Sequence, residues 1–175
     1  MTDQSYTVTK QAAELYKLRH PTGLYWADIT IDGGYNHGRI SIVSDFGNYS
    51  YYWAACGEDF KSFLSGRHID YIAGKFGADR WFDAQATLAA FSDRIQGTAD
   101  PGTKNALLAE IDNLQRHSQK AGFVAELQHC PTLIHLFEQC IDLIHGIDPG
   151  FQRLWREIWP VMLEAFKKEK EAAGG

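Results

Sequence analysis

The sequence is poor in cysteine, in long apolar runs and in positive charge. Its three cysteines, Cys56, Cys130 and Cys140, are an odd set without Cys-x-x-Cys spacing, and we expect them to be free thiols in a reducing cytoplasm. No apolar run approaches the roughly 18 residues that a membrane span requires. Residues 1–5 have neither the basic nor the apolar region of a signal peptide. These absences predict a cytoplasmic protein with no membrane partner.

Basic residues are outnumbered, with 17 Lys and Arg against 22 Asp and Glu and a net charge of −5. Binding to a nucleic-acid backbone normally requires a basic stripe, so the composition argues against direct binding to DNA or RNA. Residues 121–152 contain no Lys or Arg at all. An acidic surface without basic residues could meet a basic partner, although chance composition explains the same pattern.

Motifs that carry catalysis or bind cofactors are also missing. Gly74-Lys75 lacks the upstream glycine of a phosphate-binding loop, and Asp45-Phe46-Gly47 matches a kinase triplet without the motifs that accompany it. The one polar cluster of the aromatic region is Ser44-Asp45 with His37. A small enzyme with His37 and Asp45 as acid and base is therefore an alternative, but we expect Asp45 to cap a turn. The sequence predicts no catalytic residues and no cofactor.

The histidines of the C-terminal half suggest a metal site at first. One face of a helix predicted over 132–146 carries His135, Glu138, Asp142 and His145. Cys140 falls on the opposite, apolar face, so it cannot join the histidines around one tetrahedral ion. We expect a solvated polar face without a bound metal, on which Glu138 and Asp142 are candidates for contact with a partner.

Aromatic residues make up 13% of the chain and are concentrated in residues 24–54. Three extended runs, 24–31, 39–44 and 48–54, alternate aromatic or β-branched residues with others. Gly, Asn and Asp in 32–38 and 45–47 predict hairpin turns, so the region is typical of a β-meander. In the last run, Tyr49, Tyr51 and Trp53 share one face and Tyr52 lies on the other.

Helical periodicity dominates the rest of the chain. It predicts a helical turn around 12–18 after a short strand at 6–9, and helices over 59–65, 68–76, 83–97, 103–117, 123–127, 132–146 and from 148 onward. Pro160 lies inside the last helix and predicts a kink after Trp159. On that helix Trp155 and Trp159 are one turn apart on the apolar stripe. If Trp155 is fully buried, Trp155→Ala should lower the free energy of unfolding by about 3–5 kcal/mol.

The predicted fold class is α+β. A small N-terminal antiparallel β-meander of about three to four strands packs against a C-terminal set of about five to six helices, which cover one face of the sheet. We expect residues 1–97 to form the meander with its short helices. Residues 98–175 then form a helical subdomain packed on it within one domain.

The run Gly-Arg-Ile-Ser-Ile-Val-Ser-Asp-Phe-Gly-Asn-Tyr-Ser-Tyr-Tyr-Trp at 38–53, followed by 60–64 and 70–72, resembles a motif of uncharacterised proteins from bacteriophages and prophages. Residues 151–155 and 158–160 resemble the C-terminal part of some of them. The resemblance implies a small accessory protein of a mobile element, acting in the cytoplasm of the bacterial host. Such proteins often bind a host or phage protein stoichiometrically, and anti-CRISPR proteins inhibit a bacterial defence system in this way.

These observations predict a protein-binding module rather than an enzyme. The candidate partner-binding residues are Tyr35, His37, Tyr52, Glu138 and Asp142. A small enzyme and a phage nucleic-acid-handling factor are the alternatives. The last helix could also form the seam of a homodimer.

Overall fold

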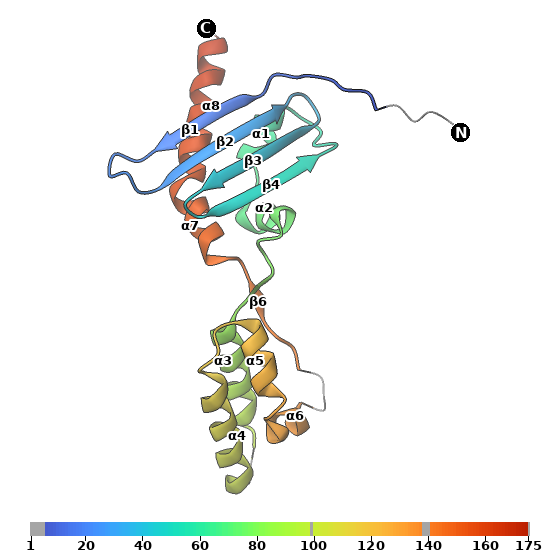
Figure 1. Ribbon diagram of the computed structural model, residues 1–175, viewed down its shortest axis with the longest axis vertical. Coiled ribbons are helices and arrows are strands. Elements are labelled where there is room, and N and C mark those ends of the chain that lie inside the picture. Colours follow the sequence, from blue (N-terminus) through green and yellow to red (C-terminus); the bar gives the residue numbers. More distant parts are fainter. Residues whose placement is uncertain (1–5, 99, 138–140, 175) are drawn as a thin grey trace, which may run out of the picture. The chain divides into compact units, whose positions relative to one another are not determined.

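The computed structural model describes residues 6–98, 100–137 and 141–174 (Figure 1). Contacts between Cα atoms group the chain into two units: Met1–Ala78 with Asp148–Gly175, here unit 1, and Asp79–Ile147, here unit 2. The chain leaves unit 1 after Ala78 and returns at Asp148, whose backbone N–H donates to the Ala78 carbonyl at 2.7 Å. These units differ from the division at residues 97 and 98 expected from the sequence, because the last two helices contact the N-terminal elements.

Unit 1 contains a four-stranded antiparallel sheet in the order β1-β2-β3-β4. Its strands are β1 (Glu14–Arg19), β2 (Trp26–Gly33), β3 (Gly38–Ser44) and β4 (Gly47–Trp53). The α+β class with an N-terminal meander is thereby confirmed. The helical turn predicted around 12–18 is wrong, because Glu14–Arg19 pairs with β2 along its whole length. The short strand predicted at 6–9 is not formed either, and these residues lie exposed.

Helices of unit 1 cover one face of this sheet (Figure 1). They are α1 (Phe60–Ser65), α2 (Ile69–Phe76), α7 (Pro149–Glu157) and α8 (Trp159–Ala173). Alternate residues of the strands point into the interface, where Ile29, Ile40 and Ile42 are buried. The buried residues of these four helices include Phe60, Leu64, Ile72, Phe151, Leu154, Trp159 and Met162.

The predicted last helix is two helices, and the break lies where Pro160 predicts a kink. Ile158 ends α7 and begins α8, so Pro160 occupies the first turn of α8. The missing N–H of a proline removes no intrahelical hydrogen bond in a first turn. The sequence therefore accommodates the proline by starting a new helix.

Unit 2 consists of helices around their own core and one short strand pair. Its elements are β5 (Trp81–Phe82), α3 (Ala84–Ile95), α4 (Pro101–Leu114), α5 (Lys120–Leu127), α6 (Pro131–Leu136) and β6 (His145–Gly146). Phe91, Leu107, Leu114 and Phe123 are fully buried in this core. The two carboxylate oxygens of Glu110 accept hydrogen bonds from the backbone N–H groups of Thr132 and Leu133 at 3.0 and 2.8 Å, which caps α6.

The helix predicted over 132–146 is wrong, since α6 ends at Leu136 and residues 141–144 are not helical. At residues 144 and 145 the backbone bonds to a distant segment of the chain, although the apolar pattern has a helical period. His145 pairs with Phe82, and the Ile144 carbonyl accepts a hydrogen bond from Asp83 N at 2.9 Å. Glu138 and Cys140 lie outside the described residues.

Candidate functional site

The face of the sheet opposite the helices carries the side chains that alternate with the core residues. We call it the open face, and it comprises Leu15, Lys17, Arg19, Trp26, Asp28, Thr30, Asp32, Arg39, Ser41, Val43, Asn48, Ser50 and Tyr52. Three of its apolar side chains are about half exposed: Leu15 at 55%, Val43 at 49% and Tyr52 at 49%. Exposed aromatic and aliphatic groups on a rigid sheet are suited to contact with another molecule.

Contacts within the open face hold its aromatic side chains in place. The Arg39 guanidinium lies 5.7 Å from the ring centroid of Tyr52, and that of Arg19 lies 5.3 Å from the ring of Trp26. Arg19 also forms an ion pair with Asp28 at 2.5 Å. Arginine stacked on an aromatic ring keeps its hydrogen-bonding groups available at the edges. The open face thus mixes ordered aromatic surface with charged groups.

The loop between β2 and β3 presents Tyr35 and His37 at one end of the sheet. Tyr35 is 76% exposed. Nδ1 of His37 lies 3.2 Å from the carbonyl oxygen of Tyr35. Between them Asn36 has φ 70°, a left-handed conformation that asparagine tolerates better than most residues. Its backbone N–H donates to the Glu58 carbonyl at 2.8 Å and its side-chain oxygen accepts from Gly57 N at 2.7 Å. The loop is therefore fixed by the segment that precedes α1.

Tyr52 belongs to the same end of the sheet. It pairs in register with Arg39, which follows His37 by two residues in the chain. The structure therefore brings three of the predicted partner-binding residues, Tyr35, His37 and Tyr52, to one end of the sheet. Their role in binding stays a prediction.

His37 and Asp45 lie at opposite ends of β3, so the alternative in which these two residues act together as acid and base is wrong. A strand rises about 3.3 Å per residue, which separates the two by more than about 20 Å. Asp45 instead accepts a hydrogen bond from the backbone N–H of Trp26 in β2 at 3.2 Å. The expected turn cap by Asp45 is wrong, because the Ser44 hydroxyl accepts from the Phe46 N–H in that turn at 3.2 Å.

The acidic candidates lie elsewhere. Asp142 is exposed in unit 2, and Glu138 is outside the described residues. The shared helical face with His135 and His145 does not exist, because α6 contains His135 but ends at Leu136, before Asp142 and His145. The described residues contain no group of three or more His, Cys, Asp or Glu that could hold a metal ion.

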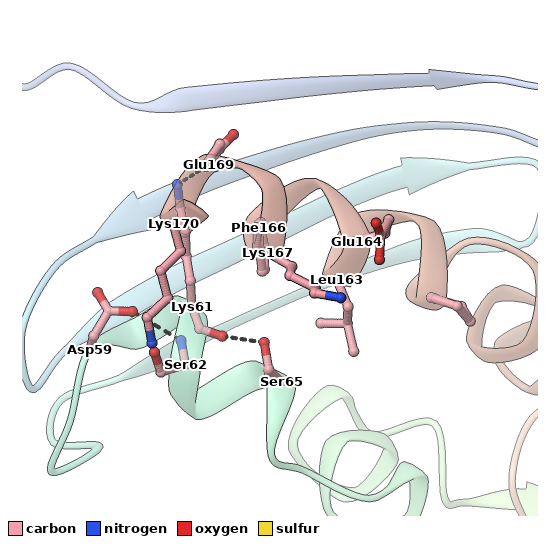
Figure 2. A pocket seen from close by; sticks show the side chains of 11 residues that line it. Asp59, Lys61, Ser62, Ser65, Leu163, Glu164, Phe166, Lys167, Glu169 and Lys170 are labelled. Carbon is pink, nitrogen blue, oxygen red and sulfur yellow. Dashed lines mark hydrogen bonds and ion pairs between the residues drawn. The ribbon is translucent and has the colours of Figure 1, made fainter. Parts of the chain in front are cut away.

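A groove between α1 and α8 is a second feature of unit 1 (Figure 2). Its volume is about 900 Å³, and Pro160, Leu163 and Phe166 form its apolar lining. The polar lining residues are Asp59, Lys61, Ser62, Ser65, Glu164, Lys167, Glu169 and Lys170. Sequence reasoning missed this groove, because its walls come from segments about a hundred positions apart, with Lys61 and Glu169 separated by 108.

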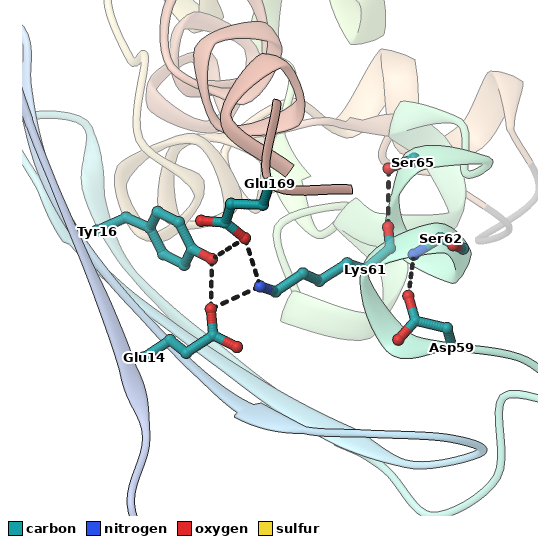
Figure 3. A network of polar contacts seen from close by, with 7 residues as sticks. All are labelled: Glu14, Tyr16, Asp59, Lys61, Ser62, Ser65 and Glu169. Carbon is teal, nitrogen blue, oxygen red and sulfur yellow. Dashed lines mark hydrogen bonds and ion pairs between the residues drawn. The ribbon is translucent and has the colours of Figure 1, made fainter. Parts of the chain in front are cut away.

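Lys61 is the centre of a polar network beside this groove (Figure 3). Its Nζ lies 2.5 Å from Oε2 of Glu14 and 2.6 Å from Oε2 of Glu169. The Tyr16 hydroxyl lies 2.5 Å from the same oxygen of Glu14 and 2.9 Å from that of Glu169. The network therefore joins β1, α1 and α8 through one ammonium group, two carboxylates and one phenol.

The electrostatics of the network keep it charged at neutral pH. Burial by itself would lower the pKa of Lys61, but hydrogen bonds with Glu14, Glu169 and Tyr16 outweigh burial and raise it. Hydrogen bonds from Lys61 and Tyr16 lower the pKa of the Glu14 carboxyl. Burial, followed by the hydrogen bond to Glu14, raises the pKa of Tyr16. Lys61 and Tyr16 thus keep their protons at neutral pH, and Lys61 forms ion pairs with the carboxylates of Glu14 and Glu169.

A family model described as a phage family, Phage_phiTE_072, matches residues 6–170. The chain belongs to this phage family. The match spans nearly all described elements, and it agrees with the phage or prophage origin implied by the resemblance of residues 38–53. No curated protein and no solved structure matches the chain. Among the described residues of this phage protein, no helix has the length and apolarity needed to cross a membrane.

Lys61→Met is expected to lower the free energy of unfolding of this phage protein at pH 7 by about 1 kcal/mol or less, because solvent screens the partly exposed ion pairs. The Glu14 pKa is lower in the folded chain than its ordinary value of 4.5. The stabilisation by the ion pair of Lys61 with Glu14 is therefore fully present above pH 4.5. It is lost as the pH falls through the pKa of Glu14 in the folded chain. Urea denaturation at pH 7 and at pH 3 measures the difference between wild type and variant, which should shrink at pH 3. Lys170→Met, in the same groove but without an ion pair to a described residue, is the control and should show no such difference.

Proposed function

We propose that this phage protein acts by stoichiometric binding of a host or phage protein, as inhibitors of bacterial defence systems of the anti-CRISPR type do. One observation supports the proposal most directly: Tyr35, at 76% exposed, and Tyr52, at 49%, lie at one end of a rigid sheet beside Arg39. Tyrosine and arginine are enriched among the residues that dominate binding energy in protein interfaces.

Tyr35 and Tyr52 are already held in place in the free protein, which also favours a role in protein binding. The Tyr35 loop is fixed by hydrogen bonds of Asn36 to Gly57 and Glu58, and the Tyr52 ring lies under Arg39. A side chain that is already ordered loses less conformational entropy when a partner covers it. The surface therefore needs little rearrangement to bind.

The charges of the open face favour a protein over a nucleic acid. Each basic residue of this face has an acidic neighbour. Arg19 forms an ion pair with Asp28, Lys17 lies opposite Asp28 in the register of β1 and β2, and Arg39 lies opposite Asp32 in that of β2 and β3. A single-stranded nucleic acid would require a groove of positive potential along its backbone. Asp142 of unit 2 is a separate candidate contact, for a basic surface of a partner.

Affinity capture with tagged protein tests the proposal, using lysate of phage-infected or defence-expressing bacteria and mass spectrometry of the retained proteins. Wild type is expected to retain one protein in stoichiometric amount. The double variant Tyr35→Ala/Tyr52→Ala should bind that protein at least tenfold more weakly, while its far-UV circular dichroism and melting stay unchanged. Trp81→Ala is a matched control, because Trp81 is 50% exposed and Tyr52 is 49% exposed. Equal retention by the double variant and the control would contradict a binding site at this end of the sheet.

The anti-defence role has its own experiment. The protein is expressed in bacteria whose defence system targets a plaque-forming phage, and plaquing efficiency is measured. Wild type should restore plaquing, and Tyr35→Ala/Tyr52→Ala should not. Unchanged plaquing with wild type would contradict the anti-defence role for the system tested.

A further inference from the structure

The two edges of the sheet are chemically different. β1 and β4 each have a neighbouring strand on one side only among the described residues. β1 carries Glu14, Lys17 and Arg19, whereas β4, with the sequence Gly-Asn-Tyr-Ser-Tyr-Tyr-Trp, carries no charge and no proline. Charged residues, prolines and bulges are the features that protect natural sheet edges from pairing with another chain. β4 lacks them and is therefore competent to pair.

β4 is also regular along its length. It pairs with β3 from Ser44↔Gly47 to Gly38↔Trp53 without a bulge. In an antiparallel pair, the N–H and C=O groups of alternate residues point away from the partner strand. β4 therefore presents an uninterrupted row of backbone groups on its outer side.

The chain also contains an extended segment that has no partner strand. Residues 6–13 precede β1, are exposed throughout and form no hydrogen bond with any described residue. Tyr6 is 98% exposed and Val8 is 92% exposed. The residues Tyr-Thr-Val-Thr at 6–9 all have high β-propensity. Such a segment is suited to add to the edge of a sheet.

We propose that residues 6–9 of one copy pair with β4 of a second copy and extend its sheet by one strand. This proposal concerns the edge of the sheet and is independent of the partner-binding surface proposed above.

The two faces of the segment match the two faces of β4. Tyr6 and Val8 would lie on the helix-covered side, beside the half-buried Tyr49 and Tyr51. Thr7 and Thr9 would then continue a row of hydroxyl groups on the open face. That row already runs through Thr30, Ser41 and Ser50, in which the Ser41 and Ser50 oxygens are 2.9 Å apart. Hydroxyl pairs across neighbouring strands stabilise a sheet.

The segment cannot reach β4 of its own chain. β1 and β4 are at opposite edges, so a strand added beyond β4 would lie four strand spacings from β1, or about 19 Å in a straight line. The chain between Thr9 and Glu14 spans at most about 18 Å when fully extended, and it would also have to pass around the sheet. A second copy supplies the edge without this constraint. Because each copy offers both a segment and an edge, the exchange can close as a symmetric dimer.

Sedimentation velocity of the full chain tests the proposal. Wild type should dimerise in a concentration-dependent manner. Thr7→Pro/Val8→Pro should weaken the dimer at least tenfold, since two adjacent prolines remove a pairing N–H in either register. Ser50→Lys should have a similar effect by placing a charge on β4. Leu15→Lys is the control, because it places the same charge on the open face of β1, and it should remain dimeric.

Asn48→Lys, at another exposed position of β4, replaces Ser50→Lys if circular dichroism shows that the latter is unfolded. A wild type that is monomeric up to about 100 μM would overturn the proposal, since edge pairing of this kind requires a second copy. Weakening by only one of the two variants would also overturn it, because pairing needs both partners.

Mixing the two variants gives a sharper result. The Thr7→Pro/Val8→Pro chain keeps an intact β4, and the Ser50→Lys chain keeps an intact segment. A mixture should therefore form a heterodimer with one intact pairing, although neither chain dimerises well alone. Failure to form this heterodimer would refute strand exchange.

Discussion

Gly38→Ala is expected to lower the free energy of unfolding of unit 1 by about 3 kcal/mol or more. A Cβ atom at Gly38 would lie 2.3 Å from Cγ of the Phe60 ring, far inside van der Waals contact. Phe60 is 1% exposed, so its ring has no solvent to move into. Overpacking a filled core usually costs about 1–3 kcal/mol and costs more when neighbours cannot shift. Tryptophan fluorescence in a urea titration measures the loss, because Trp26, Trp53, Trp155 and Trp159 all belong to unit 1.

The surroundings of Phe60 explain why the clash is not easily relieved. The Phe60 N–H donates to the Gly34 carbonyl at 3.0 Å, which fixes the start of α1 against the β2–β3 loop. The Trp53 ring lies 5.6 Å from the Phe60 ring. A Cβ atom at Gly33, which pairs with Gly38, would be 2.7 Å from the Gly38 Cα. The aromatic ring therefore packs directly on a glycine pair of the sheet.

Gly34→Ala is the matched control in the same loop. A Cβ atom there would meet nothing within 4 Å, and the expected change is below about 0.5 kcal/mol. Adding Phe60→Leu to Gly38→Ala should recover part of the lost stability, because a smaller side chain makes room for the methyl group. If Gly38→Ala and Gly34→Ala were equally stable, Phe60 would not pack on Gly38.

The meander was predictable because local signals agree with each other. Period-two alternation and the turn residues of 32–38 and 45–47 specify the same three strands. β1 was missed, since Glu-Leu-Tyr-Lys-Leu-Arg fits a helical turn equally well by local pattern. Its pairing with β2, for example Tyr16 with Ile29 and Lys17 with Asp28, decides for a strand. Tertiary pairing of this kind leaves no mark within the segment itself.

The error over 132–146 has the same cause. The apolar residues Leu133, Phe137 and Ile144 continue a helical period beyond the point where α6 ends. Residues 141–144 are instead not helical, and His145 pairs with Phe82 of β5. A periodic pattern indicates which side chains are apolar. It does not indicate whether the backbone pairs with a distant strand instead of forming a helix.

The candidate site was predictable to different degrees in its parts. Exposure of Tyr52 follows from strand alternation once the opposite face, with Trp53, is assigned to the core. The Lys61 network was not predictable, because Glu14 and Glu169 lie 47 and 108 positions from Lys61 in the chain. Only the packing of α8 beside β1 and α1 brings these charges together.

Trp159→Ala is expected to lower the free energy of unfolding by about 3–5 kcal/mol. Trp159 is 2% exposed, and its ring stacks on that of Trp155 with centroids 4.6 Å apart. Trp155 itself is only half-buried, so Trp155→Ala should cost less, about 1–2 kcal/mol for the surface that it buries. The sequence predicted the larger loss of stability at Trp155, whereas the structure predicts it at Trp159. The reason is that the helix breaks at Ile158 and a new helix begins at Trp159.

Trp159→Phe separates the contribution of ring packing from that of the indole N–H. The Nε1 atom of Trp159 is buried, and the described residues offer it no hydrogen-bond acceptor. A buried donor without a partner destabilises the folded state, so its removal offsets part of the lost ring volume. Trp159→Phe should therefore retain most of the stability that Trp159→Ala loses. Urea denaturation followed by far-UV circular dichroism measures these variants, with Val161→Ala, exposed at 55%, as the control on the same helix. A loss at Trp155 as large as that at Trp159 would mean that α7, rather than the start of α8, anchors this stacked pair in the core.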